Sequence, residues 1–242
     1  MRNRNLVTLV TVALAIVLGS GMALADNLNI TGNFNGGIQI NDPNGHGLSG
    51  TYGGGVFTGG YLNGTALPWI YCVDIPDHVY VPGDYPTASS NNNGTIAGST
   101  ANFNATGITG NPIPQGTQEG VTNAKNVAWL LYTYAASATD YQHQVALQGA
   151  IWNQIYGVTL TGCTGGGCVS IYNTDLAALS AAISGGTVGN YVGNFTWLSP
   201  SGSDSNNVDQ GLITQVPDGG MTLMLLGGAL VGLETLRRRF RV

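Results

Sequence analysis

The sequence predicts an α+β fold, a β barrel or sandwich that carries a helical insert, within a chain of 242 residues. Short apolar stretches separated by Gly, Asn, Pro and Thr fill residues 27–118, a pattern typical of strands joined by turns. From about Val121 to Ser184 the apolar residues recur instead at helical spacing. Charged residues make up only 8 % of the chain, against about 25 % in ordinary soluble proteins, so a typical cytoplasmic enzyme is not expected.

The elements follow in order along this body. Strands are expected around residues 37–40, 55–58 and 69–73, and residues 89–116, rich in Asn, Gly, Thr and Ser, predict a long surface loop or weak hairpins. Three helices are expected at residues 123–136, 141–156 and 175–183. Thr122 or Asn123 can cap the first helix, and Asp140 is a good N-cap for the second. Closing strands are expected at 189–198.

The charges are distributed unevenly. Six of the seven basic residues lie at the two ends, and residues 27–216 contain only Lys125 against nine acidic residues, a net charge of −8. A phosphate backbone is bound by clustered Lys and Arg. The composition therefore excludes nucleic acid as a partner.

The N-terminus has the three-part layout of a secretory signal peptide. Arg2 and Arg4 precede an apolar run, and small residues end at Ala25 in an A-x-A pattern. We therefore assign residues 1–25 to a signal peptide and residues 26–198 to an exported body. The polar run at 199–215 is interpreted as a linker.

The C-terminal 27 residues combine three features in order. A Pro-Asp-Gly motif comes first, a mostly apolar stretch at 221–236 follows, and an arginine cluster ends the chain. The apolar stretch can cross a bilayer only marginally, and the arginines would stay on the cytoplasmic side. The motif comprises Val216, Pro217, Asp218, Gly219 and Gly220, and the cluster comprises Arg237, Arg238, Arg239 and Arg241.

These features resemble the VPDSG variant of PEP-CTERM sorting signals, with Gly219 at the position of the family's serine. The resemblance covers residues 216–242 and implies that an exosortase is a partner. It also implies that residues 221–236 anchor the chain transiently in the inner membrane and that the tail is removed near Pro217. The body would then reach the cell surface or the extracellular matrix.

Three cysteines in an exported protein leave one unpaired. Cys163 and Cys168 flank Thr-Gly-Gly-Gly, a flexible loop that lets them form a disulfide in an oxidising compartment. Cys72 is then free, and a buried, inert cysteine is the simplest interpretation of it.

Gln148 lies at the centre of the apolar face of the second helix, at about 100° per residue. A buried amide must find hydrogen-bond partners or costs roughly 1–3 kcal/mol. Two interpretations stay open: the amide bonds to strand backbone, or it is no longer an amide. His143 lies about 140° away on the same helix and projects from the other face.

Tyr-Cys-Val-Asp at 71–74 and Gln-Gly-Ala-Ile-Trp at 148–152 resemble the two signatures of bacterial thioester domains. In that family the thiol and the glutamine condense, with loss of ammonia, into a thioester that tethers the protein covalently. The resemblance implies a thioester between Cys72 and Gln148, shielded by Tyr71, Ile151 and Trp152. Its target would be a surface amine or hydroxyl nucleophile.

Other functions are weaker interpretations. The alternative is a non-reactive structural or exopolysaccharide-associated matrix protein, and a cysteine hydrolase is third because Cys72 would need a neighbouring histidine. Asp74, Asp77 and His78 could together hold a metal, but such spacing is common in acidic loops. We expect no enzyme activity, no catalytic residues, no cofactor and no bound metal.

Overall fold

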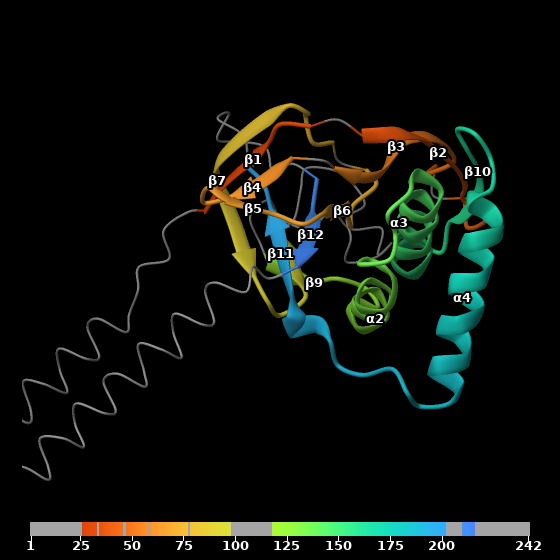
Figure 1. Cartoon of the computed structure of the whole chain (residues 1–242). Helices are drawn as coiled ribbons and strands as arrows, with labels where there is room; N and C mark the ends of the chain where they lie inside the picture. Colours follow the sequence, from red (N-terminus) through yellow and green to blue (C-terminus); the bar gives the residue numbers. More distant parts are fainter. Residues whose placement is uncertain are drawn as a thin grey trace, which may run out of the picture.

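The computed structural model describes residues 26–32, 34–45, 47–57, 59–76, 78–97, 118–201 and 210–215. The first half of this part is all strand, and the second half combines three α-helices with the remaining strands (Figure 1). The strands are β1 (Asp26–Ile30), β2 (Phe34–Asn41), β3 (Gly50–Phe57), β4 (Gly60–Leu62), β5 (Thr65–Ala66), β6 (Ile70–Cys72), β7 (Gly83–Asn91), β8 (Thr95–Ala97), β9 (Gln118–Gly120), β10 (Thr159–Cys163), β11 (Phe195–Ser199) and β12 (Leu212–Gln215). The helices are α2 (Ala124–Tyr134), α3 (Tyr141–Tyr156) and α4 (Cys168–Ser184), with a short 3₁₀ turn at Val192–Asn194.

Ten strands form one antiparallel sheet in the order β10-β2-β3-β6-β12-β11-β7-β1-β4-β5, and β8 pairs separately with β9. The short strand β6 lies near the middle, where Cys72 pairs with Leu212 of β12 and Ile70 pairs with Phe57 of β3. A strand with neighbours on both sides has its backbone groups satisfied and its side chains held in register. Cys72 therefore stands on a rigid part of the sheet.

The three helices gather beside the β10-β2-β3 end of the sheet (Figure 1). Helix α3 packs against β3, β2 and β10, and it also contacts α2 and α4. Because α3 is covered on several sides, its apolar residues are almost wholly buried, as are the largest core side chains of the sheet. Trp152, Trp197, Tyr71 and Phe57 are each below 2 % exposed.

The predicted α+β class is confirmed: the described chain is mainly antiparallel sheet with a few helices, an arrangement consistent with the predicted sandwich. Helices occur where the insert was expected, but β10 interrupts the insert and α4 begins at Cys168 rather than near residue 175. The disulfide and the glycines of the loop before α4 determine where this helix starts. The periodicity of the later residues alone does not indicate that start.

Two local predictions were wrong. The side chain of Asn123 makes no cap hydrogen bond, because its backbone is left-handed (φ 53°) and its Nδ2 donates instead to the carbonyl of Gln154 at 2.7 Å. The end of the predicted linker at 199–215 is a strand instead, because Leu212 and Ile213 are fully buried in β12. Of the stretch 89–116, expected to form a loop or weak hairpins, residues 89–91 end β7 and residues 95–97 form β8, which pairs only with the short strand β9, and residues 98–116 lie outside the described part.

The predicted signal peptide at 1–25 and the predicted sorting signal at 216–242 lie outside the described residues. Within the part of the chain that the structure describes, no helix is both long enough and apolar enough to span a bilayer.

Candidate functional site

Cys72 and Gln148, which are 76 residues apart in the sequence, lie in contact in the fold. Cys72 ends β6, and Gln148 lies in the middle of α3, which packs on the neighbouring strand β3. The helix begins where Asp140 accepts a hydrogen bond from the His143 backbone at 2.9 Å, as predicted, and it ends at Gly157 in the left-handed conformation (φ 72°). Both helix ends are fixed by local chemistry, and the packing of α3 on β3 brings Gln148 to Cys72.

The Gln148 side chain pairs with the peptide groups of Cys72 through two hydrogen bonds. Its Oε1 accepts from the Cys72 backbone N–H at 2.9 Å, and its Nε2 donates to the Cys72 carbonyl at 2.7 Å. Gln148 is 0 % exposed and Cys72 is 2 % exposed. A buried amide with both partners in place costs little, so the first of the two open interpretations, bonding to strand backbone, describes these contacts.

The thiol has its own partner. Cys72 Sγ donates to Gln210 Oε1 at 3.2 Å, and Gln210 Nε2 donates to the carbonyl of Asp74. The carboxylate of Asp74 in turn accepts from the Tyr156 hydroxyl at 3.0 Å. Burial, and then the charge of Asp74, raise the pKa of the Cys72 thiol well above its usual value. The sulfur is therefore a protonated thiol at neutral pH rather than a free thiolate.

The chain neighbours of Cys72 and Gln148 on β6 and α3 are buried as well. The predicted shielding residues Tyr71, Ile151 and Trp152 are each no more than 1 % exposed, and Trp152 meets the Tyr52 ring edge-on at 5.9 Å between centroids. The Tyr71 hydroxyl and the Trp152 indole nitrogen are buried with no hydrogen-bond partner in the described structure. Burial, with a smaller contribution from the charge of Asp175, raises the pKa of Tyr71. Cys72 and Gln148 thus lie buried in the core, next to side chains that are themselves buried.

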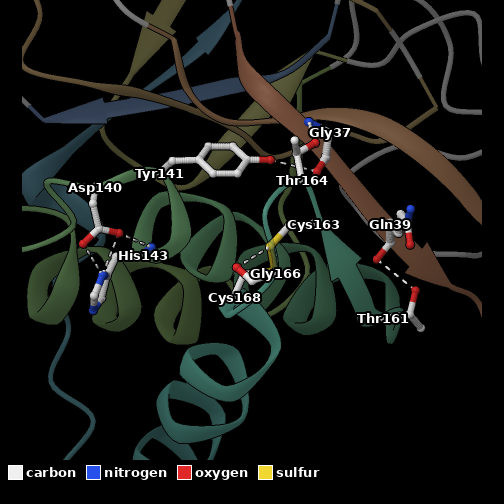
Figure 2. Close-up of a disulfide and its surroundings, with 10 residues drawn as sticks. All are labelled: Gly37, Gln39, Asp140, Tyr141, His143, Thr161, Cys163, Thr164, Gly166 and Cys168. Carbon is white, nitrogen blue, oxygen red and sulfur yellow. Dashed lines mark hydrogen bonds and ion pairs between the residues drawn. A yellow bond between two sulfur atoms is a disulfide. The ribbon is translucent and has the colours of Figure 1, made fainter.

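Among the described residues, the hydrogen-bond partner of the thiol is Gln210, and neither His78 nor His143 bonds to it. His143 is half exposed, and its ring pairs with the carboxylate of Asp140 at 2.7 Å (Figure 2). His78 is exposed beside Gln210, whose backbone N–H donates to the His78 carbonyl at 3.4 Å. Asp77, which was weighed with Asp74 and His78 as a metal ligand, lies outside the described residues, and the described ones hold no group of three or more potential ligands.

The predicted disulfide is present. Cys163 and Cys168 are joined with their Cα atoms 6.3 Å apart, and this leaves Cys72 as the free cysteine. Figure 2 shows the bridge at the start of α4, close to Gly37 of β2, whose carbonyl accepts a hydrogen bond from the Tyr141 hydroxyl at 2.9 Å. The bridge therefore connects β10 to α4 next to the N-terminal end of α3.

Gln210 is the site residue that sequence reasoning missed, because it was included in the polar linker. The apolar pair Leu212-Ile213, which follows it directly, was the available signal for a buried strand. A strand there brings Gln210 to the end of β6, beside Cys72.

A scan against known protein families matches residues 215–240 to the VPDSG-CTERM motif. The chain thus carries a PEP-CTERM-type sorting tail, which is the mark of an exported, cell-envelope-associated protein that an exosortase processes. Comparisons with curated proteins and with solved structures gave no significant match.

Proposed function

We propose that this exported protein attaches covalently to a surface nucleophile through an internal thioester between Cys72 and Gln148. In this proposal an exosortase removes the tail near Pro217, after residues 221–236 have held the chain transiently in the inner membrane. The body is then delivered to the cell surface or the extracellular matrix. The single observation that carries the proposal is the paired contact between the Gln148 amide and the Cys72 peptide.

The chemistry of bond formation follows from that contact. The sulfur of Cys72 attacks Cδ of Gln148, the Cδ–Nε2 bond breaks, and the nitrogen leaves as ammonia with the thiol proton. The Cys72 N–H already donates to Oε1 at 2.9 Å, so it is in place to stabilise the negative charge that develops on this oxygen. Holding the two groups together supplies an effective concentration on the order of 10⁵–10⁸ M in well-oriented intramolecular reactions.

The same enclosure protects the product from hydrolysis. Cys72 and Gln148 are buried, as are their chain neighbours Tyr71, Ile151 and Trp152, and water is excluded from apolar sites of this kind. Amine attack forms a new amide at Gln148, whose N–H can again donate to the Cys72 carbonyl. The reaction with the target therefore restores a hydrogen bond that the thioester lacks.

The raised pKa of Cys72 disfavours repeated turnover through a thiolate. A cysteine hydrolase needs a thiolate that is generated repeatedly, next to a histidine or another positive group. Burial and the charge of Asp74 act in the opposite direction on Cys72. We therefore place hydrolysis behind covalent attachment.

The second candidate is a non-reactive structural or exopolysaccharide-associated matrix protein. The same hydrogen bonds favour it, because an unreacted Gln148 amide and an unreacted Cys72 thiol both have hydrogen-bond partners. In that case the pair only fixes α3 to β6.

Reaction with methylamine separates the two candidates. We expect methylamine to add to Gln148 and to free the Cys72 thiol for alkylation, and we expect Cys72→Ala and Gln148→Ala each to abolish both effects. His143→Ala is the matched helix variant and should react like the wild type, since its ring is exposed and bonded to Asp140. Wild-type protein that takes up no methylamine, while its thiol alkylates without amine treatment, would establish the structural alternative.

A further inference from the structure

A small hollow adjoins Gln210, the hydrogen-bond partner of the Cys72 thiol. It has a volume of about 110 Å³ and is lined by Phe34, Gly53, His78, Val79 and Gln210, and we call it the Gln210 hollow. Gln210 is the side chain that accepts the hydrogen bond of the Cys72 thiol. The inner wall of the hollow is therefore one hydrogen bond away from the sulfur.

The two sides of the Gln210 hollow differ in exposure. Gln210 and Val79 are each 7 % exposed and lie inside, whereas His78 is exposed and stands at the rim. The Phe34 ring packs directly on the bare backbone of Gly53, because a Cβ on Gly53 would lie only 2.9 Å from Phe34 Cδ2. The hollow thus leads from an exposed side chain to the partner of the thiol.

We infer that the Gln210 hollow is the path by which an attacking amine reaches the Cys72–Gln148 bond, and that Gln210 positions that amine. This inference rests on the proposed thioester. In the thioester Cys72 has no S–H, so Gln210 Oε1 loses the donor that it has in the present structure. A primary amine in the hollow supplies an N–H to the same oxygen.

The transfer step balances without any further reagent. The amine nitrogen bonds to Cδ of Gln148, the Cδ–Sγ bond breaks, and its electron pair goes to the sulfur of Cys72. One amine proton ends on that sulfur. The regenerated thiol then donates to Gln210 Oε1 again, as it does in the structure described. Gln210 accepts a hydrogen bond before and after the step and takes no proton itself.

The size of the hollow selects among amines. A cavity of about 150 Å³ is sufficient for benzene in a well-studied apolar case, and the Gln210 hollow is smaller, at about 110 Å³. An unbranched amine, such as methylamine or the end of a lysine side chain, fits this space better than an aromatic amine. The residues that line the hollow include no Lys or Arg, and the body has a net negative charge. Both features also favour an amine.

The test blocks the rim and measures two reactions. We expect His78→Trp to slow methylamine addition about tenfold, while the matched variant His143→Trp stays within about twofold of the wild type. The second reaction needs no thioester: in the Gln148→Ala background, Cys72 is a free thiol, and His78→Trp should slow its alkylation by iodoacetamide in the folded protein. Near-ultraviolet circular dichroism checks that each variant is folded.

The role of Gln210 has a separate readout. Gln210→Met should still lose ammonia on forming the thioester, but it should react with methylamine about tenfold more slowly, with unchanged spontaneous hydrolysis. A purely structural loosening would instead speed hydrolysis. Ammonia loss with equal amine rates in wild type, His78→Trp and Gln210→Met would overturn this inference and leave the proposed function intact. Absence of ammonia loss would overturn the proposed function together with the role of Gln210. Equal rates of Cys72 alkylation in the Gln148→Ala background, with and without His78→Trp, would overturn the path through the Gln210 hollow.

Discussion

Replacing Asp175 with Asn should stabilise the protein at neutral pH and remove part of its dependence on pH. Asp175 lies on α4 and is only 5 % exposed. Desolvation by burial raises its pKa from 3.8 to about 6, although the charge of His143 opposes this shift. Its carboxylate is also close enough to Tyr71 to raise the pKa of that phenol.

The sign follows from proton binding. Between pH 4 and pH 6 the folded state holds the Asp175 proton while the unfolded chain releases it, so the free energy of unfolding falls as the pH rises through this interval. One pKa unit corresponds to about 1.36 kcal/mol. The rise of the Asp175 pKa from 3.8 to about 6 therefore limits the loss in free energy of unfolding above pH 6 to about 3 kcal/mol. Asn cannot ionise, so Asp175→Asn should avoid this loss.

Urea unfolding followed by tryptophan fluorescence measures the effect at pH 4.0 and pH 7.5. We expect Asp175→Asn to exceed the wild type by up to about 3 kcal/mol at pH 7.5 and to differ little at pH 4.0. Asp84→Asn is the matched control, because it removes one negative charge from an exposed position of the same acidic body. An Asp175→Asn variant that is less stable than the wild type at pH 7.5, or a gap that does not change with pH, would refute the reasoning.

Three further predictions concern the disulfide, the sheet and the tail. Removing the disulfide with Cys163→Ser should lower the free energy of unfolding by about 2 kcal/mol, the chain-entropy value for so short a loop; unchanged urea unfolding would contradict this. Gly54→Ala should cost about 1–3 kcal/mol, because the new Cβ would lie 2.5 Å from Ile38 Cγ2, whereas Gly120→Ala meets nothing within 4 Å and should be near neutral in the same assay. In a host with the matching exosortase, mass spectrometry of the mature protein should find no residue much beyond Pro217, and full-length chains in such cells would overturn the sorting prediction.

Local sequence signals predicted the helices and the central strands well. Asp140 caps α3 through its side chain, and the helical period places Gln148 on the buried face and His143 on the exposed one. Each of these features depends on residues within a few positions of one another. For the same reason the Cys163–Cys168 pairing could be predicted from its short glycine-rich loop.

The features that the sequence did not predict depend on contacts between distant segments. Gln210, which is 138 residues from Cys72 in the sequence, reaches it only because β12 pairs with β6, and its polar neighbours resemble a linker. Asn123 is of a residue type that is favoured at N-cap positions, but its side chain donates to the carbonyl of Gln154 on α3 instead. In both cases tertiary contacts override the local preference.

The intact mass of mature protein, purified without exposure to amines, tests the central claim most directly. With the Cys163–Cys168 bridge counted, we expect a mass one ammonia below that of the sequence, and no alkylation of Cys72 until an amine is added. A mass lower than the sequence by only the two disulfide hydrogens, with Cys72 alkylated on unfolding in the absence of amine, would contradict the thioester and leave Cys72 and Gln148 as a structural pair.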